Sequence, residues 1–177
     1  ALNFGLGQRN QLLEFDFYPK VSADSAAVPV DREYKVNKMV EHYKETVCKD
    51  IPLARIVPKF LRKRVVRAGL KRMYKSQKIT CEIKRLSEVI HQFDVKRINL
   101  LKIDAENYET HVLAGIEEKD WEKIRQIAME VHAHIEGGKN LLQEMIGLLE
   151  GKGFKVSLGE ESRETLLGVY MIYARRR

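Results

Sequence analysis

Cysteine, proline and tryptophan are scarce in this chain of 177 residues, which contains two, four and one of them. Cys48 and Cys81 form no Cys-x-x-Cys pair, so neither a disulfide framework nor a cysteine-based zinc site is indicated. The apolar runs are only a few residues long, well short of the ~20 needed to cross a bilayer, and no leader pattern is visible. We therefore expect a cytoplasmic protein.

The hydrophobic content of 44% is high enough for one folded domain and too high for a disordered chain. The chain opens at Ala1 directly in an apolar stretch. We expect it to be a fragment of a longer sequence.

Acidic residues are absent from residues 52–78, which contain ten of the 32 Lys and Arg residues. In the rest of the chain acidic residues outnumber basic ones, so the net charge of +7 comes from this one segment. An amphipathic helix with a cationic outer face could bind anionic lipid, RNA, an acidic carrier protein or an anionic substrate, or simply present a solvated face. Helical spacing predicts such a helix here, with an apolar face made of Val57, Leu61, Val65, Leu70 and Met73.

From Lys78 onward, strand-like and helix-like patterns alternate. Alternation of this kind predicts an α/β fold with a mainly parallel sheet, and the short loop before the last strand predicts an antiparallel C-terminal pair. The expected strands are 79–83, 98–103, 124–131, 154–158 and 166–174, and the expected helices are 85–93, 108–116 and 139–150.

Carboxylates and histidines follow two of these expected strands, at the edge where ligands bind in open α/β sheets. Asp104 and Glu106 follow the first strand, and Glu130 and His132 end the second on one face, joined by His134 if the strand continues. A histidine or carboxylate placed there could transfer protons near neutral pH. Two histidines and a carboxylate could instead bind a divalent metal, with Asp104 as a further oxygen ligand.

The stretch 98–109, followed by Val112-Leu-Ala-Gly-Ile116, resembles the signature of FkbM-type S-adenosylmethionine-dependent methyltransferases. In that family an apolar strand ends in a Lys-(Ile/Val)-Asp-Val-Glu motif and leads into a Glu-x-x-Val-Leu-x-Gly helix. Further segments look like the branch that occurs as O-methyltransferase domains of polyketide and nonribosomal-peptide assembly lines. They are residues 5–7, 15–19, 120–132 and 168–175.

The chain departs from this family at two places. Asn107 follows Glu106 where members normally have Gly, or Lys-Ser in the assembly-line branch. The glycine-rich loop after the first strand and the acidic end of the second, which hold the cofactor, are absent. The family's strand order 3-2-1-4-5-7-6 then implies a partial Rossmann-like sheet whose first two strands are missing, between a strand at 1–6 and the strand at 98–103. The resemblance implies the C-terminal part of a methyltransferase domain, inactive alone.

For the complete domain, the resemblance implies methyl transfer from S-adenosylmethionine to an oxygen of a small-molecule or carrier-bound natural-product intermediate. It places Asp104 and Glu106 at the cofactor, with Asp104 also at the catalytic lip. His132 becomes the general base and Glu130 the residue that orients it. Residues 31–78 would form a basic, lid-like helical insertion, and residues 79–177 the α/β core of a single domain.

Two alternatives remain open from the residues alone. One is a noncatalytic module that binds RNA or anionic membrane through residues 52–78, although Phe60 and Tyr74 are the only aromatic residues there and form a poor stacking platform for nucleic acid. The other is a metal-dependent enzyme built on the face of Glu130, His132 and His134.

Overall fold

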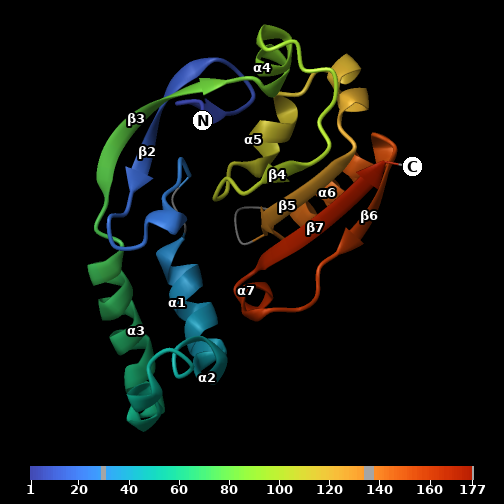
Figure 1. Cartoon of the computed structure of the whole chain (residues 1–177). Coiled ribbons are helices and arrows are strands. Elements are labelled where there is room, and N and C mark those ends of the chain that lie inside the picture. Colours follow the sequence, from blue (N-terminus) through green and yellow to red (C-terminus); the bar gives the residue numbers. More distant parts are fainter. Residues whose placement is uncertain (29–30, 134–137, 177) are drawn as a thin grey trace.

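The strands of the protein form two separate sheets (Figure 1). The computed structural model describes residues 1–28, 31–133 and 138–176. One sheet has the order β1-β3-β2, with strands β1 (Gly5–Leu6), β2 (Gln11–Phe17) and β3 (Gln77–Lys84). The other has the order β4-β5-β7-β6, with strands β4 (Leu101–Ile103), β5 (Gln126–His132), β6 (Phe154–Leu158) and β7 (Val169–Arg176). The strand expected at residues 1–6 is thus only two residues long.

The predicted antiparallel C-terminal pair is confirmed, because β6 runs antiparallel to β7. The prediction of a mainly parallel sheet is wrong for the strands that the structure describes, since only the β1–β3 and β4–β5 pairings are parallel. The reason is the connection between β6 and β7, which contains only the short helix α7 (Arg163–Leu166). Without a crossover helix, β7 turns back and lies antiparallel between β5 and β6.

The main hydrophobic core lies between the four-stranded sheet and its helices. Alternation along β5 buries Ile127, Met129 and Val131 on one face. Ile172 and Leu149 are fully buried against them. The helices of this region are α4 (Leu86–Gln92), α5 (Glu109–Ala114), the 3-10 helix η3 (Glu118–Lys123) and α6 (Gly138–Gly151).

Two glycines allow the first sheet to approach α5 closely. A Cβ atom on Gly115, which follows α5, would lie 2.2 Å from the carbonyl oxygen of Gly7. A Cβ on Gly7 would in turn lie 2.8 Å from Ile83 of β3 and 3.0 Å from Tyr108. The backbone contact holds the end of α5 against the residue after β1, and the contact with Tyr108 holds its start.

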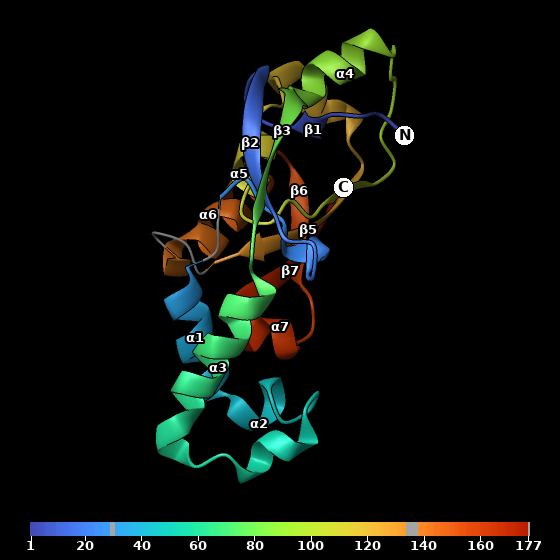
Figure 2. The same ribbon diagram turned by 90° about the vertical axis from the view of Figure 1, so that its left-hand side faces the viewer.

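A helical arm projects from the sheets between the paired strands β2 and β3 (Figure 2). Asp31 begins its first helix by accepting hydrogen bonds from the backbone N–H groups of Glu33 and Tyr34. The arm has its own core, in which Val36 and Tyr43 are buried with residues of α3. Its helices are α1 (Arg32–Glu41), α2 (Tyr43–Thr46), the 3-10 helix η2 (Pro52–Ile56) and α3 (Lys59–Met73).

The predicted basic helix is confirmed as α3, but its predicted apolar face is partly wrong. Val65 and Met73 are exposed, whereas Val66 and Leu70 are buried. Val66 and Leu70 are four residues apart and therefore lie on one face of the helix. Within the described ranges, no helix is both long and apolar enough to cross a membrane.

Candidate functional site

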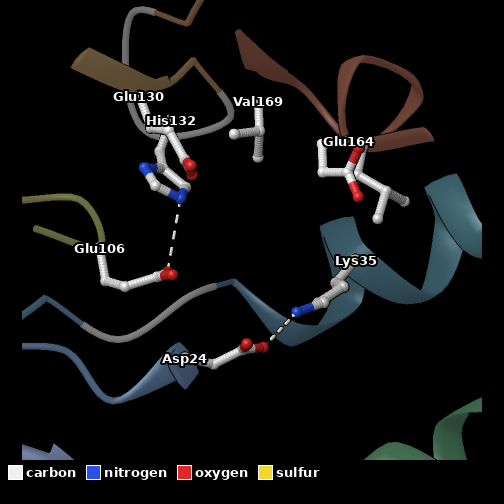
Figure 3. Close-up of a pocket in the computed structure, with 8 residues that line it drawn as sticks. Asp24, Lys35, Glu106, Glu130, His132, Glu164 and Val169 are labelled. Atoms are coloured by element: carbon white, nitrogen blue, oxygen red, sulfur yellow. Dashed lines mark hydrogen bonds and ion pairs between the residues drawn. The ribbon is translucent and has the colours of Figure 1, made fainter. Parts of the chain in front are cut away.

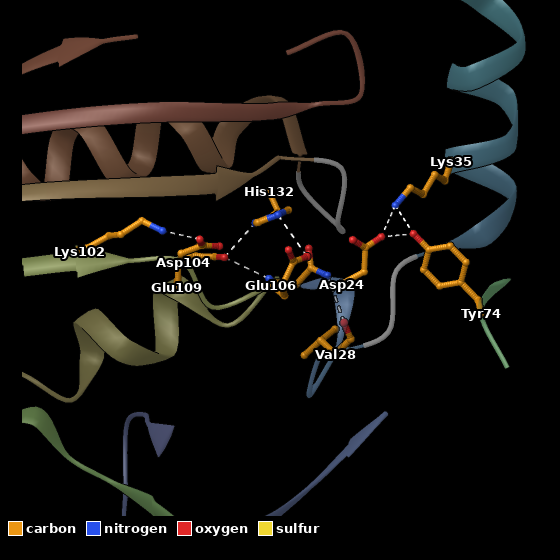
Figure 4. A network of polar contacts seen from close by, with 10 residues as sticks. Asp24, Val28, Lys35, Tyr74, Lys102, Asp104, Glu106, Glu109 and His132 are labelled. Atoms are coloured by element: carbon orange, nitrogen blue, oxygen red, sulfur yellow. Dashed lines mark hydrogen bonds and ion pairs between the residues drawn. The ribbon is translucent and has the colours of Figure 1, made fainter. Parts of the chain in front are cut away.

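The parallel pairing of β4 and β5 brings their carboxyl ends to the same edge of the sheet (Figure 4). Glu106 lies in the loop after β4, Glu109 is the first residue of α5, and His132 is the last residue of β5. The three side chains meet there although they come from different elements. The sequence thus folds so that two carboxylates lie against one imidazole.

His132 lies between these carboxylates and is only 4% exposed. Its Nδ1 is 2.9 Å from Oε1 of Glu109, and its Nε2 is 3.4 Å from Oε2 of Glu106. Oε1 of Glu109 also accepts a hydrogen bond from the backbone N–H of Asn107, at 3.1 Å. A neutral His132 that donates Nδ1–H to Glu109 therefore turns the lone pair of Nε2 toward Glu106.

The electrostatics of the three residues are coupled. Burial lowers the pKa of His132, but the hydrogen bond and charge of Glu109, with smaller contributions from Glu106 and Glu130, outweigh it and raise the pKa overall. Burial raises the pKa of Glu106 to about 7, against the opposing effect of His132. A carboxyl group with a pKa near neutrality thus lies beside a histidine whose pKa is raised.

A cavity of about 200 Å³ opens beside His132 (Figure 3). Glu130 and His132 both line it, as strand alternation predicts. The sequence predicted that Glu130 orients His132, but Glu109 makes this contact instead. Glu109 was not selected from the sequence, although it is the Glu of the Glu-x-x-Val-Leu-x-Gly motif. The cavity is lined by Asp24, Lys35, Glu106, Glu130, His132, Glu164, Leu167 and Val169.

Asp104 lies outside this cavity. Its carboxylate is 2.6 Å from Nζ of Lys102, and it lines a second cavity of about 370 Å³ between β4 and the three-stranded sheet. Glu106 lines both cavities and forms part of the wall between them. The structure thus brings Glu106, Glu130 and His132 together and places Asp104 on the other side of Glu106.

Three residues that the sequence analysis did not select connect the arm to the site. Nζ of Lys35, on α1, is 2.7 Å from Oδ2 of Asp24, which also accepts a hydrogen bond from the hydroxyl of Tyr74. Burial raises the pKa of Asp24, but the hydrogen bonds from Lys35 and Tyr74 outweigh it, so that pKa is lowered. Burial and the Asp24 carboxylate raise the pKa of Tyr74. Figure 3 shows the Lys35–Asp24 pair across the cavity from His132.

Asn107 explains one of the departures noted in the sequence. Its backbone has φ of +74°, in the left-handed region that glycine adopts without strain and asparagine tolerates best among other residues. Its side chain donates a hydrogen bond to the carbonyl oxygen of Val28, at 3.1 Å. Asparagine thus fills a position with the backbone conformation of a glycine.

The metal hypothesis is not tested, because His134 lies outside the described residues. In the part of the chain that the structure describes, the group with metal-ligand spacing is His91, Glu117 and Asp120, at η3. Lys123 lies 3.0 Å from Asp120, and Arg85 lies 3.0 Å from Glu117. These cations already neutralise the carboxylates, so ion pairs account for this cluster.

Comparison with known proteins gives a family match over most of the chain. Residues 3–156 match the model of the methyltransferase FkbM domain. The chain is 39% identical over 100 residues to 31-O-demethyl-FK506 methyltransferase FkbM of Streptomyces tacrolimicus, covering 56% of this chain and 37% of that protein. It is 28% identical over 165 residues to methyltransferase sdnD of Sordaria araneosa, covering 89% of this chain and 54% of that protein.

A third relative, methyltransferase 1 of Beauveria bassiana, is 28% identical over 174 residues, covering 97% of this chain and 59% of that protein. The chain thus spans between 37% and 59% of the length of these three relatives. No solved structure matches it. The family model covers far more than half of the chain, and the chain therefore belongs to the FkbM methyltransferase family.

Proposed function

We propose that this chain is the C-terminal part of an S-adenosylmethionine-dependent O-methyltransferase domain in which His132 is the general base. The observation that carries the proposal is the buried Glu109–His132–Glu106 group at the carboxyl ends of β4 and β5. A general base must be held in one tautomer and must exchange protons near the working pH. Glu109 holds the imidazole of His132, and histidine is the side chain most readily poised for proton transfer near neutral pH.

Each residue of the group has a distinct task. Glu109 accepts the hydrogen bond from Nδ1–H and holds the imidazole, so Nε2 receives the proton that leaves the acceptor hydroxyl. The positive charge that then forms on His132 is stabilised by Glu109 and Glu106. Glu109 is 3% exposed, and in such a water-poor setting a fixed charge acts more strongly than in solvent.

The second cavity has the chemistry of a site for a cationic cofactor. Its lining includes the carboxylates of Asp104 and Glu106. The apolar part of the lining includes Leu6, Ile83 and Val112. S-adenosylmethionine carries a sulfonium charge and, when bound, supplies the methyl group. Asp104 and Glu106 would hold it in the second cavity, next to the acceptor in the neighbouring cavity beside His132, which Glu106 also lines.

The remaining part of the cofactor site would come from strands that precede this chain in the parent protein. The open edge of β4 supports this proposal, since among the described strands β4 pairs only with β5. The second cavity lies beside β4 and is lined on its far side by Gly5, Leu6 and Ile83 of the other sheet. The expected order 3-2-1-4-5-7-6 puts the two missing strands between β4 and that sheet, so the end of the cavity at Asp104 and Glu106 would be left for the cofactor. The isolated chain would be inactive.

The relatives and the arm support a class of methyl acceptor. One relative is named as a methyltransferase of 31-O-demethyl-FK506, and another matching protein is the AMB antimetabolite synthetase AmbE of Pseudomonas aeruginosa, 35% identical over 97 residues. We propose an oxygen acceptor on a small-molecule or carrier-bound natural-product intermediate. Lys35, on the arm, borders the cavity where the acceptor would bind.

The test is methyl transfer by a version of the protein that includes the missing strands. His132→Ala should lower kcat at saturating cofactor by roughly 10²–10⁴-fold, the usual contribution of a general base. His42→Ala, in the arm, is the matched control and should leave kcat unchanged. Mass spectrometry of the acceptor measures the rate, and unchanged turnover by His132→Ala would remove this residue from the mechanism.

A further inference from the structure

Four large apolar side chains are exposed together at the far end of the arm. Figures 1 and 2 both place α2 and the start of α3 at that end, away from the sheets. The exposed fractions are 57% for Ile51, 77% for Leu53, 80% for Ile56 and 81% for Phe60. We call these four residues the arm tip. All four lie within ten residues of sequence, in and around η2 and at the start of α3.

The arm does not need these side chains for its own packing. Its core is closed by other residues, among them Val36, Val66 and Leu70, which are at most 7% exposed. Ala54, between Leu53 and Ile56, points inward and is buried. The 3-10 helix η2 therefore turns its large residues outward, which costs hydrophobic free energy unless something covers them.

The charge around the arm tip is mainly positive, although Glu45 and Asp50 are also exposed at this end of the arm. No acidic residue occurs between Asp50 and Glu82, and the segment between them carries ten Lys and Arg residues. Lys63 and Arg67 face Glu33 on α1, at 3.9 and 2.7 Å. Lys59 and Arg64 of α3 are exposed beside Phe60. The arm tip thus combines exposed apolar side chains with neighbouring exposed cations, here called the cationic rim, which include Lys59 and Arg64.

This combination fits an anionic membrane surface. Lys and Arg stay at the level of the lipid phosphates, while apolar side chains enter the headgroup and acyl boundary. RNA fits poorly, because three of the four side chains are aliphatic and neither stack on bases nor form hydrogen bonds, which leaves Phe60 as the one aromatic residue among them. A protein partner would need a groove matching side chains from a loop, a 3-10 helix and an α-helix. A bilayer accepts a convex tip of any shape.

We propose that the arm tip inserts into anionic lipid membranes, with Leu53, Ile56 and Phe60 as the inserted side chains. This property goes beyond methyl transfer and depends on the arm alone. It would hold the protein at a membrane through the arm, with the cavity at the opposite end of the arm. Loss of catalysis without loss of lipid binding, or the reverse, would separate the two proposals.

The experiment is vesicle co-sedimentation of the 177-residue chain with phosphatidylglycerol-containing vesicles and with pure phosphatidylcholine vesicles. We expect binding to the anionic vesicles that weakens with added salt, because screening shortens the reach of the cationic rim. Soluble glycerophosphate should displace no more of the chain than sodium chloride at the same ionic strength, since a free headgroup offers no apolar phase. Greater displacement by glycerophosphate would mean that the rim binds phosphate alone and would overturn insertion.

The decisive variant is Leu53→Ser/Ile56→Ser/Phe60→Ser, which should lower partitioning at least tenfold. Its matched control is Leu12→Ser/Leu100→Ser/Leu158→Ser, which removes equally apolar residues exposed elsewhere and should bind like the parent. Equal binding by both variants would overturn the proposal. So would self-association or RNA binding that depends on the arm tip in a chain that does not bind vesicles.

Discussion

At the scale of residues, the site depends on two carboxylates that hold His132 in different ways. Glu109 is buried, is tied to the backbone of Asn107, and sets which nitrogen of the imidazole carries the proton. Glu106 is partly exposed, lines both cavities and has a pKa of about 7. One carboxylate therefore orients the histidine, while the other exchanges protons near neutral pH.

The raised pKa of Glu106 predicts how stability depends on pH. The folded state binds its proton more tightly than the unfolded state, whose ordinary value is 4.5. Stability is therefore lost as pH rises from about 4.5 through about 7. Glu106→Gln cannot ionise, so it should unfold like the parent chain at pH 5 and be more stable at pH 8, by on the order of 1–3 kcal/mol.

Urea unfolding of the chain at both pH values measures this difference. The exposed Glu122→Gln serves as the control and should follow the parent at pH 5 and at pH 8. A Glu106→Gln variant with the same pH dependence as the parent would mean that Glu106 ionises normally and that its burial has no electrostatic consequence.

At the scale of elements, the contact between Gly7 and Gly115 holds the end of α5 against β1. Gly115→Ala would place a methyl group 2.2 Å from the Gly7 carbonyl oxygen, and neither backbone can yield without shifting β1 or α5. We expect a loss of roughly 1–3 kcal/mol in the free energy of unfolding. Chemical denaturation provides the measurement.

Gly147→Ala is the matched control, because Gly147 lies within α6 with no neighbouring atom within 4 Å of an added Cβ. It should stabilise the chain by roughly 0.5–1 kcal/mol through helix propensity. If both alanine variants had the same stability, the close approach of β1 and α5 would not restrain the fold.

The elements also show what the sequence could and could not predict. Apolar runs that end in Asp104 and His132 revealed the two strands and the edge where the site lies, because the periodicity of a strand is local. The sequence did not predict a role for Asp24, Lys35 and Tyr74. These residues come together only where the base of the arm meets the edge of the sheet. The parallel character of the sheet was overestimated because nothing local in β7 tells which strand it will pair with.

At the scale of the whole molecule, the proposed site lies between two sheets that are separated by a cavity. Only the part of the site around His132 is assembled. The residues proposed for proton transfer are assembled around His132, while the second cavity is bounded by β4 and the three-stranded sheet without a glycine-rich loop among the described residues. This asymmetry is expected of a methyltransferase domain that lacks its first two strands. Cofactor binding should therefore depend on those strands.

The most direct test is calorimetric titration of S-adenosylhomocysteine into the 177-residue chain and into a version extended N-terminally through the two strands. We expect near-stoichiometric binding by the extended version and weak or no binding by the chain alone. Asp104→Asn should weaken binding by the extended version. Tight binding by the chain alone would contradict the incomplete cofactor site. Absence of binding by a folded extended version would contradict the methyltransferase function.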